Sequence, residues 1–149
     1  MALKEQVNAE MKAALLGGDR FVGDTLRNLK AAILDEEVAQ NKRDEGLSDE
    51  EVERVIAREV KKRVESAKLY RENNRPELAE PEEREMEILK RFLPEQLSED
   101  ELSVLVDKKI AQLGISGPQA MGQVIGALKK DLGNTADGAM LARIVKEKL

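Results

Sequence analysis

The sequence predicts an all-α protein, and three observations support this fold class. Apolar residues recur at helical rather than alternating spacing along almost the whole chain of 149 residues. The four prolines stand at positions 76, 81, 94 and 118, which leaves long stretches without a helix breaker. Two capping boxes, in which a serine is followed three residues later by a glutamate, mark helix starts at Ser48 and Ser98. We therefore expect a four-helix unit followed by a three-helix unit.

Two helices are expected before residue 47. The first ends at the pair Gly17-Gly18. The second starts at an aspartate N-cap, Asp19 or Asp24, and is expected to run to about Lys42. The apolar stripes that define these two helices are Leu3, Val7, Met11 and Ala14 in the first and Val22, Leu26, Leu29 and Ile33 in the second.

Two more helices complete the N-terminal unit. The third opens at the Ser48 capping box, and the turn residues 73–76 close it. The fourth begins among glutamates, whose negative charge suits the positive end of a helix dipole. The apolar stripes are Val52, Ile56, Val60, Val64 and Ala67 in the third helix and Leu78, Met86, Leu89 and Phe92 in the fourth.

A domain boundary is predicted after residue 96, because the charge balance changes there. Residues 1–96 hold 18 Lys and Arg against 23 Asp and Glu, a net charge of −5, whereas residues 97–149 hold 7 of each. The second unit, residues 97–149, is expected to contain three helices, the first of which opens at Ser98 and ends at Gly114. Their stripes are Leu102, Leu105, Val106, Ile110 and Leu113, then Val124, Ile125 and Leu128, and finally Leu141, Ile144, Val145 and Leu149.

The composition restricts the chemistry that the chain can perform. It contains no cysteine and no histidine, which removes thiolate nucleophiles, the commonest metal ligand and the side chain best suited to proton transfer near neutral pH. No P-loop and no GxGxxG motif is present. We therefore predict no catalytic residue, no metal site and no cofactor. The glutamates at 77–87 are interpreted as helix-start and solubility charges.

Charge and hydropathy also restrict the partners. A net charge of −5 argues against indiscriminate coating of nucleic acid, and three aromatic residues are too few for a platform that stacks single-stranded bases. The apolar stretches, such as residues 13–16, are far shorter than a membrane span. Glu5 and Glu10 interrupt the N-terminus, so no secretory signal is predicted. We expect a cytosolic protein that does not contact a membrane.

The densest basic segment lies in the third helix. At 100° per residue, its basic side chains gather on one side, where they can follow a line of phosphates. Glutamates lie on the same side, and Glu50–Arg54 and Glu59–Arg63 are pairs at the i,i+4 spacing in the favourable order. A salt-bridged, solvated face is therefore favoured over nucleic-acid binding. The residues of this secondary basic face are Arg54, Arg58, Lys61 and Lys68.

Two glycines stand about one helical turn apart, at Gly122 and Gly126. Each costs a helix about 0.8–1 kcal/mol relative to alanine, so a compensating contact is expected. Close packing against a neighbouring helix is the favoured explanation, and contact with the sugar–phosphate backbone of a ligand is the alternative. Further along, residues 133–138 precede the last helix, whose free amides can receive a phosphate. Because Asp137 competes for those amides, a capping turn is favoured there.

Read together, the C-terminal residues resemble the YqeY-like proteins. The same pattern is similar to the C-terminal tail of GatB, one of the subunits of the tRNA-dependent amidotransferase. Two segments of the N-terminal unit are also similar to YqeY-like segments, so the resemblance covers nearly the whole chain and implies a four-helix unit followed by a three-helix unit. The segments that carry it are Met121–Lys130, Gly133–Gly138 and Val145–Leu149, together with Leu93–Ser98 and Leu26–Ile33.

The resemblance implies a connection to tRNA. In the amidotransferase, the tail is associated with tRNA binding, whereas ATP-dependent activation and glutamine hydrolysis lie elsewhere. A shared module does not bring a partner's active site with it. YqeY-like proteins often have arginine where this chain has Thr135, so a phosphate contact made there in relatives would be missing here. The positions that match the family pattern are Gly122, Val124, Gly126, Lys129, Gly133, Ala136 and Asp137.

Three functional hypotheses follow. The leading one is a non-catalytic helical accessory protein that binds structured RNA, above all tRNA, through the last three helices. The second is a protein–protein adaptor for an amidotransferase or synthetase subunit. The third, which the resemblance implies, is a component of a carbon–nitrogen ligase that takes its amide nitrogen from glutamine. The candidate RNA-binding residues are Gly122, Gly126, Lys129, Lys130, Asn134, Thr135, Arg143 and Lys146.

Overall fold

The structure, a computed structural model, describes residues 2–149. Over this range the regular elements are seven α-helices and two short 3-10 helices, without a strand, which confirms the all-α fold class. None of these helices combines the length and the apolar character that crossing a membrane requires. The backbone divides into two compact units at Leu93–Pro94, and the following paragraphs describe each unit by itself.

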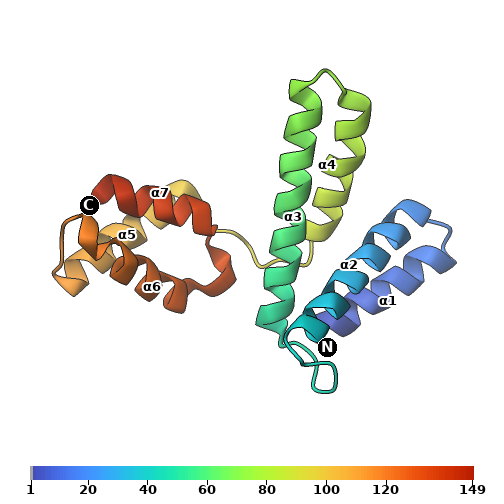
Figure 1. Cartoon of the computed structure of the whole chain (residues 1–149), viewed down its shortest axis with the longest axis horizontal. Helices are drawn as coiled ribbons and strands as arrows, with labels where there is room; N and C mark the ends of the chain where they lie inside the picture. The colour runs from blue at the N-terminus through green and yellow to red at the C-terminus, as the bar shows by residue number, and fades with distance from the viewer. Residues whose placement is uncertain (1) are drawn as a thin grey trace. The chain divides into compact units, whose positions relative to one another are not determined.

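The N-terminal unit consists of two helical hairpins (Figure 1). The first pairs α1 (Leu3–Leu16) with α2 (Arg20–Ala39), and the second pairs α3 (Asp49–Glu72) with α4 (Pro76–Lys90). The two hairpins pack together around one aliphatic core, to which all four helices contribute. Its buried members are Leu3, Val7, Met11, Leu26, Leu29, Ile33, Val52, Val55, Ile56, Val60, Leu89 and Phe92.

The α1–α2 hairpin depends on a close approach at Gly23. This glycine is buried in α2, and a Cβ atom at its position would overlap the side chain of Leu15 in α1. The Asp19 carboxylate caps α2 by accepting a hydrogen bond from the amide of Val22 at 3.2 Å, as one of the two expected N-caps. A small residue inside one helix thus allows the neighbouring helix to lie against it.

The second helix ends earlier than predicted. It stops at Ala39 rather than near Lys42, because Asn41 adopts a left-handed conformation with a φ angle of 56°. The amides of Asn41 and Lys42 then donate to the carbonyls of Val38 and Glu37, at 3.1 and 2.7 Å. This pair of bonds is a Schellman motif, in which asparagine takes the place that glycine usually occupies.

The outer half of the α3–α4 hairpin has little apolar core. Among the described residues, the core cluster has no fully buried member between Val60 and Leu89, and the buried residues of that stretch are the small Ala67 and Ala79. Val64, which the stripe predicts to be buried, is 45% exposed. Aliphatic packing therefore holds the inner half of this hairpin, and another interaction is needed further out.

Ion pairs supply that interaction. Arg63, whose side chain is 11% exposed, reaches Glu59 on its own helix and Glu85 on α4, each at 3.2 Å. Arg71 pairs with Glu83 closer to the hairpin turn. The glutamates of α4 therefore do more than balance a helix dipole, since two of them link α4 to α3. Because Arg63 is largely buried, its pairs are screened less by solvent than an exposed pair would be.

The C-terminal unit packs three helices, α5 (Glu99–Leu113), α6 (Met121–Leu132) and α7 (Gly138–Lys148). Short 3-10 helices at Pro118–Ala120 and Gly133–Thr135 precede α6 and α7. All three α-helices contribute to a separate aliphatic core. Its buried members are Leu102, Val106, Val124, Leu128, Leu141, Ile144 and Val145.

Both predicted capping boxes are present. The amide of Glu51 donates to the Ser48 hydroxyl at 3.2 Å, and the amide of Ser48 donates to the Glu51 carboxylate at 3.1 Å. The same reciprocal bonds join Ser98 and Glu101, at 3.1 and 3.4 Å. Gly114 ends α5 with a φ angle of 64°, as its place after the stripe predicts. Local sequence signals therefore set these helix boundaries.

The Glu51 carboxylate gives the unit a predictable response to acid. Its ion pair with Lys42 at 2.8 Å, followed by its bond to the Ser48 amide, lowers the pKa of Glu51 from 4.5 to about 2. A carboxylate whose pKa is lower in the folded state stabilises the fold above pH 4.5, and this contribution is lost as the pH falls through about 2. Glu51→Gln should therefore flatten the pH dependence of stability between pH 4.5 and 2, measured by urea unfolding at a series of pH values.

The matched control is Glu65→Gln, which removes an exposed carboxylate from the same helix. This variant should keep the wild-type dependence of stability on pH. Equal slopes for the wild type and Glu51→Gln between pH 4.5 and 2 would contradict the assignment.

Candidate nucleic-acid interface

One side of α6 turns glycines and lysines toward solvent. Val124 and Leu128 are buried in the core of the C-terminal unit and fix the opposite side of the helix. Steps of 100° per residue place the exposed set on a single side, which we call the glycine face. Its members, all exposed, are Gly122, Gly126, Lys129 and Lys130.

Neither glycine of this face is used for packing within the C-terminal unit. A Cβ atom at Gly122 or at Gly126 would have no neighbour within 4 Å outside the local helix backbone. The contrast is Gly23 in α2, where a Cβ would overlap Leu15. Close packing against a neighbouring helix, which the spacing favoured, is therefore wrong for residues 94–149. In the interior of α6, Gly126 costs about 1 kcal/mol that no contact in this unit offsets.

The lysines of the glycine face have no ionic partner in their unit. Over residues 94–149, neither ammonium group of Lys129 and Lys130 forms a hydrogen bond or an ion pair, and both side chains are exposed. The same holds for Lys146 in α7 and for Lys108 in α5. Lys108 was not among the predicted residues, because the sequence does not distinguish it from its neighbour Lys109. Within residues 94–149, these four lysines are the cations that a phosphate can reach without breaking an existing pair.

Arg143, another predicted contact, is already engaged. Its guanidinium donates to the Glu99 carboxylate at 2.8 Å and lies 3.5 Å from a carboxylate oxygen of Glu147. The bond to Glu99 raises the pKa of Arg143 above its usual value. Arg143 therefore joins α7 to α5, and binding RNA would compete with this link. The other ion pairs between helices of this unit are Lys109–Asp131 and Lys148–Asp107, at 2.7 and 2.9 Å.

Asn134 and Thr135 hold the turn before α7. The carbonyl of Thr135 accepts a hydrogen bond from the amide of Leu97, and the carbonyl of Asn134 accepts one from the side chain of Gln96, both at 2.8 Å. The Thr135 hydroxyl donates to the carbonyl of Leu132 at 2.6 Å. These two predicted contacts thus tie the segment before α5 to the turn between α6 and α7.

The start of α7 is a capping turn, as the sequence favoured. Asp137 accepts a hydrogen bond from the amide of Ala139 at 3.0 Å. Its carboxylate occupies the place that a phosphate would need and repels an anion there. The glycine face, rather than this helix end, is the accessible feature of the unit.

Two of the four members of the secondary basic face on α3 form ion pairs. Arg54 pairs with Glu50 at 3.1 Å, and Arg58 pairs with Glu36 of α2 at 2.7 Å. The bond from Arg58 holds the pKa of Glu36 below its usual value. The salt-bridged interpretation is therefore confirmed for both arginines. The members of this face without an ion pair in residues 2–149 are Lys61 and Lys68.

These features define a class of protein with two aliphatic helical units and an exposed helix face that combines glycines with unpaired lysines. Within residues 2–149, no group of three or more acidic side chains is arranged to hold a metal ion. The chain belongs to the YqeY-like protein family, whose family model matches residues 4–149. The resemblance to the YqeY-like proteins, drawn from the sequence motifs, is thereby confirmed.

A relative from the yeast Clavispora lusitaniae (strain ATCC 42720) extends this comparison. The chain is 26% identical over 144 residues to the protein named "Altered inheritance of mitochondria protein 41, mitochondrial". The match covers 96% of this chain and 74% of the relative. Because the name of the relative places it in mitochondria, the cytosolic location expected from the sequence stays a prediction.

Replacing Gly126 tests whether the glycine face makes any packing contact within the fold. Gly126→Ala should stabilise α6 by about 1 kcal/mol, because alanine has the higher helix propensity and its Cβ meets no neighbour. Hydrogen exchange of the α6 amides measures this change. Gly23→Ala is the contrasting variant, and it should destabilise the N-terminal unit because the added Cβ overlaps Leu15. Faster exchange in α6 after Gly126→Ala would contradict the open glycine face.

Proposed function

We propose that the chain is a non-catalytic accessory protein whose C-terminal unit binds structured RNA, such as tRNA, across the glycine face. The observation that carries this proposal is the pair of open glycines next to two unpaired lysines on α6. Without Cβ atoms, the α6 backbone can approach a sugar–phosphate backbone closely. Lys129 and Lys130 then neutralise phosphates and release counterions.

Recognition in this proposal is of RNA shape rather than of base sequence. Residues 94–149 contain no aromatic side chain on which a base could stack. Double-stranded RNA is recognised mainly through its shape, its 2′-hydroxyls and its phosphates, and such contacts suit a helix with glycines and lysines. The neutral charge of residues 97–149, against −5 for residues 1–96, also favours the second unit for contact with a polyanion.

The resemblance to the amidotransferase tail supports RNA binding and argues against catalysis by this chain. That tail is associated with tRNA, and the bond-making steps of the amidotransferase lie in other parts of the enzyme. This chain has neither the cysteine of a thiol glutaminase nor a histidine to serve as a base. In our proposal, the chain therefore contributes to carbon–nitrogen ligation by binding RNA, and a partner enzyme makes the bond.

Charge reversal on the glycine face tests RNA binding. We expect Lys129→Glu combined with Lys130→Glu to weaken tRNA binding at least tenfold and to reduce the salt dependence of the affinity. Each lost phosphate contact should lower the slope of log K against log salt concentration by about 0.7–0.9. Fluorescence anisotropy with labelled tRNA at several salt concentrations measures both quantities.

Two control variants make the result specific. Lys12→Glu with Lys90→Glu produces the same change in net charge on exposed lysines of the N-terminal unit and should bind tRNA like the wild type. Gly126→Ala should bind tRNA more weakly although its fold is more stable, because its Cβ stands where the RNA backbone approaches. Unchanged binding by the double glutamate variant, or no binding by the wild type at low salt, would refute the proposal.

A protein partner on the same face is the second candidate. Two glycines one turn apart can also accept a closely packed helix, and the acidic N-terminal unit suits a protein partner better than RNA. Affinity purification with and without nuclease separates the two candidates. An amidotransferase or synthetase subunit that stays bound after nuclease treatment and is lost in Gly126→Ala would support the adaptor. Loss of every partner after nuclease treatment would support RNA.

A further inference from the structure

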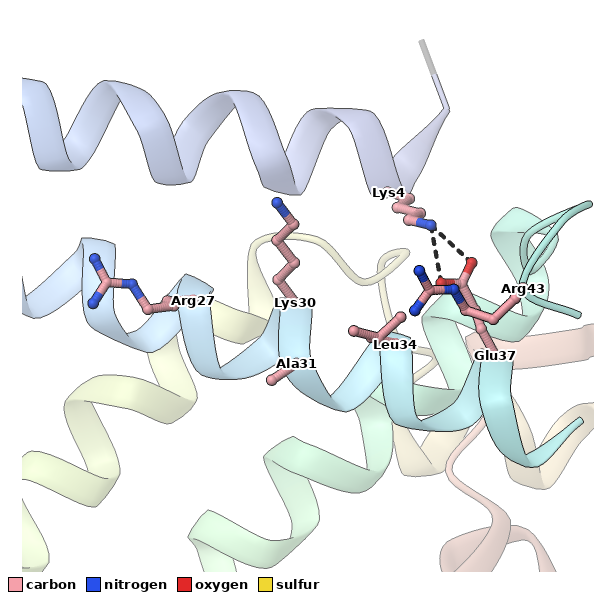
Figure 2. Close-up of a pocket in the computed structure, with 7 residues that line it drawn as sticks. All are labelled: Lys4, Arg27, Lys30, Ala31, Leu34, Glu37 and Arg43. Carbon is pink, nitrogen blue, oxygen red and sulfur yellow. Dashed lines mark hydrogen bonds and ion pairs between the residues drawn. The ribbon is translucent and has the colours of Figure 1, made fainter.

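The N-terminal unit contains a hollow beside α2 that the sequence did not reveal. It has a volume of about 450 Å³. Four of the seven residues that line it, drawn in Figure 2, are cations, although residues 1–96 carry a net charge of −5. We call it the cationic hollow. It is lined by Lys4 from α1, by Arg27, Lys30, Ala31, Leu34 and Glu37 from α2, and by Arg43 from the loop after α2.

One ion pair anchors the hollow. The Glu37 side chain is 1% exposed, and the ammonium of Lys4 donates to both of its carboxylate oxygens, at 3.0 and 2.8 Å (Figure 2). These two opposite charges compensate each other and join α1 to the end of α2. The remaining charged side chains of the lining are all cations, so the hollow keeps a local excess of positive charge.

These three cations are available to a ligand. Lys30 donates to the neutral amide oxygen of Asn8 at 2.9 Å, which leaves its charge uncompensated. Arg27 lies 3.7 Å from Asp24, and both of these side chains are exposed, so the pair is weak. Over residues 2–149, the guanidinium of Arg43 forms neither a hydrogen bond nor an ion pair. An anion entering the hollow therefore needs to break no strong bond.

The loop that carries Arg43 is held in place on both sides. Before Arg43, the Schellman motif fixes the end of α2, and Lys42 pairs with Glu51 at 2.8 Å. After it, the amide of Gly46 donates to the Lys42 carbonyl at 2.8 Å. Gly46 packs beside Glu37, since a Cβ there would be in van der Waals contact with the carboxylate at 3.4 Å. Arg43 is thus presented to the hollow by an ordered backbone rather than by a free loop.

We propose that the cationic hollow binds a phosphate monoester attached to an apolar or aromatic group, such as a nucleoside monophosphate. Arginine and lysine from separate segments line the hollow, and the planar guanidinium binds phosphate oxygens in pairs. Ala31 and Leu34, the latter 39% exposed, provide apolar surface next to these cations. The volume lies within the range of about 300–1,000 Å³ that small-ligand sites occupy.

A terminal phosphate has two sources, the free nucleotide and the 5′-phosphorylated end of an RNA. Both present the same dianion, so the experiment includes both. The site does not rest on RNA binding by the glycine face, since its residues belong to the other unit. The Lys129→Glu, Lys130→Glu variant should therefore keep the affinity of the hollow for a nucleoside monophosphate.

The test is titration of the full chain, followed by amide chemical shifts, with AMP, adenosine, inorganic phosphate and short RNA oligomers. The oligomers carry either a 5′-phosphate or a 5′-hydroxyl. AMP is expected to shift the amides of residues 27–34 and 43 saturably, and adenosine to bind at least tenfold more weakly. Lys30→Gln with Arg43→Gln should weaken AMP binding at least tenfold and leave the helix content and the melting temperature unchanged.

The matched control is Lys61→Gln with Lys68→Gln, which removes two exposed cations without an ion pair from α3 and should bind AMP like the wild type. If only the 5′-phosphorylated oligomer binds, and the Lys30→Gln, Arg43→Gln variant loses it, the site takes the phosphate from an RNA end. Equal binding of AMP and adenosine would overturn the proposal. So would wild-type affinity in the Lys30→Gln, Arg43→Gln variant, or the absence of shifts with every phosphorylated probe.

Discussion

Burial of one aliphatic stripe on each helix is the constraint on which the rest of the structure depends. A helix satisfies most of its backbone hydrogen bonds internally, so only one of its sides has to leave water. With aromatic residues at 2%, both cores are filled mainly by Leu, Ile and Val, as at Leu26, Ile56 and Leu141. The other side of each helix remains available for charges and, in α6, for glycines. Function in this protein therefore has to be sought on the outer sides of the helices.

Charge pairing then determines which parts of that surface can bind an anion. The segment richest in arginine and lysine is largely neutralised by Glu36, Glu50 and the glutamates of α4. Smaller groups of cations have no ion pair in the described residues, namely Lys129 and Lys130 in one unit and Lys30 and Arg43 in the cationic hollow of the other. With a net charge of −5, the chain repels polyanions at long range, so binding has to depend on these local groups. The first group belongs to an open helix face, whereas the second lines a concave site of ligand size.

Much of the fold could be predicted from the sequence, because short-range signals set the helices. The hydrogen bonds that form the capping boxes at Ser48 and Ser98, and the bond that ends α5 at Gly114, each join residues only a few positions apart in the sequence. Two predictions about these helices are wrong, for different reasons. Asn41 ends α2 early because its left-handed conformation allows a Schellman motif, which asparagine signals less strongly than glycine does. Val64 lies on the predicted stripe but beyond the reach of the core, and periodicity cannot tell where along a helix packing stops.

The sequence by itself determined the helical class, the succession of stripes and the motifs that place the chain among the YqeY-like proteins. It also determined that two glycines and two lysines share one side of α6. Only the tertiary structure decided that this side is open and which cations are paired. The reason is the sequence separation of the partners, since Lys4 meets Glu37 across 33 residues and Arg143 meets Glu99 across 44. Helical periodicity relates neighbours three or four residues apart, whereas such pairs exist only once the helices have packed.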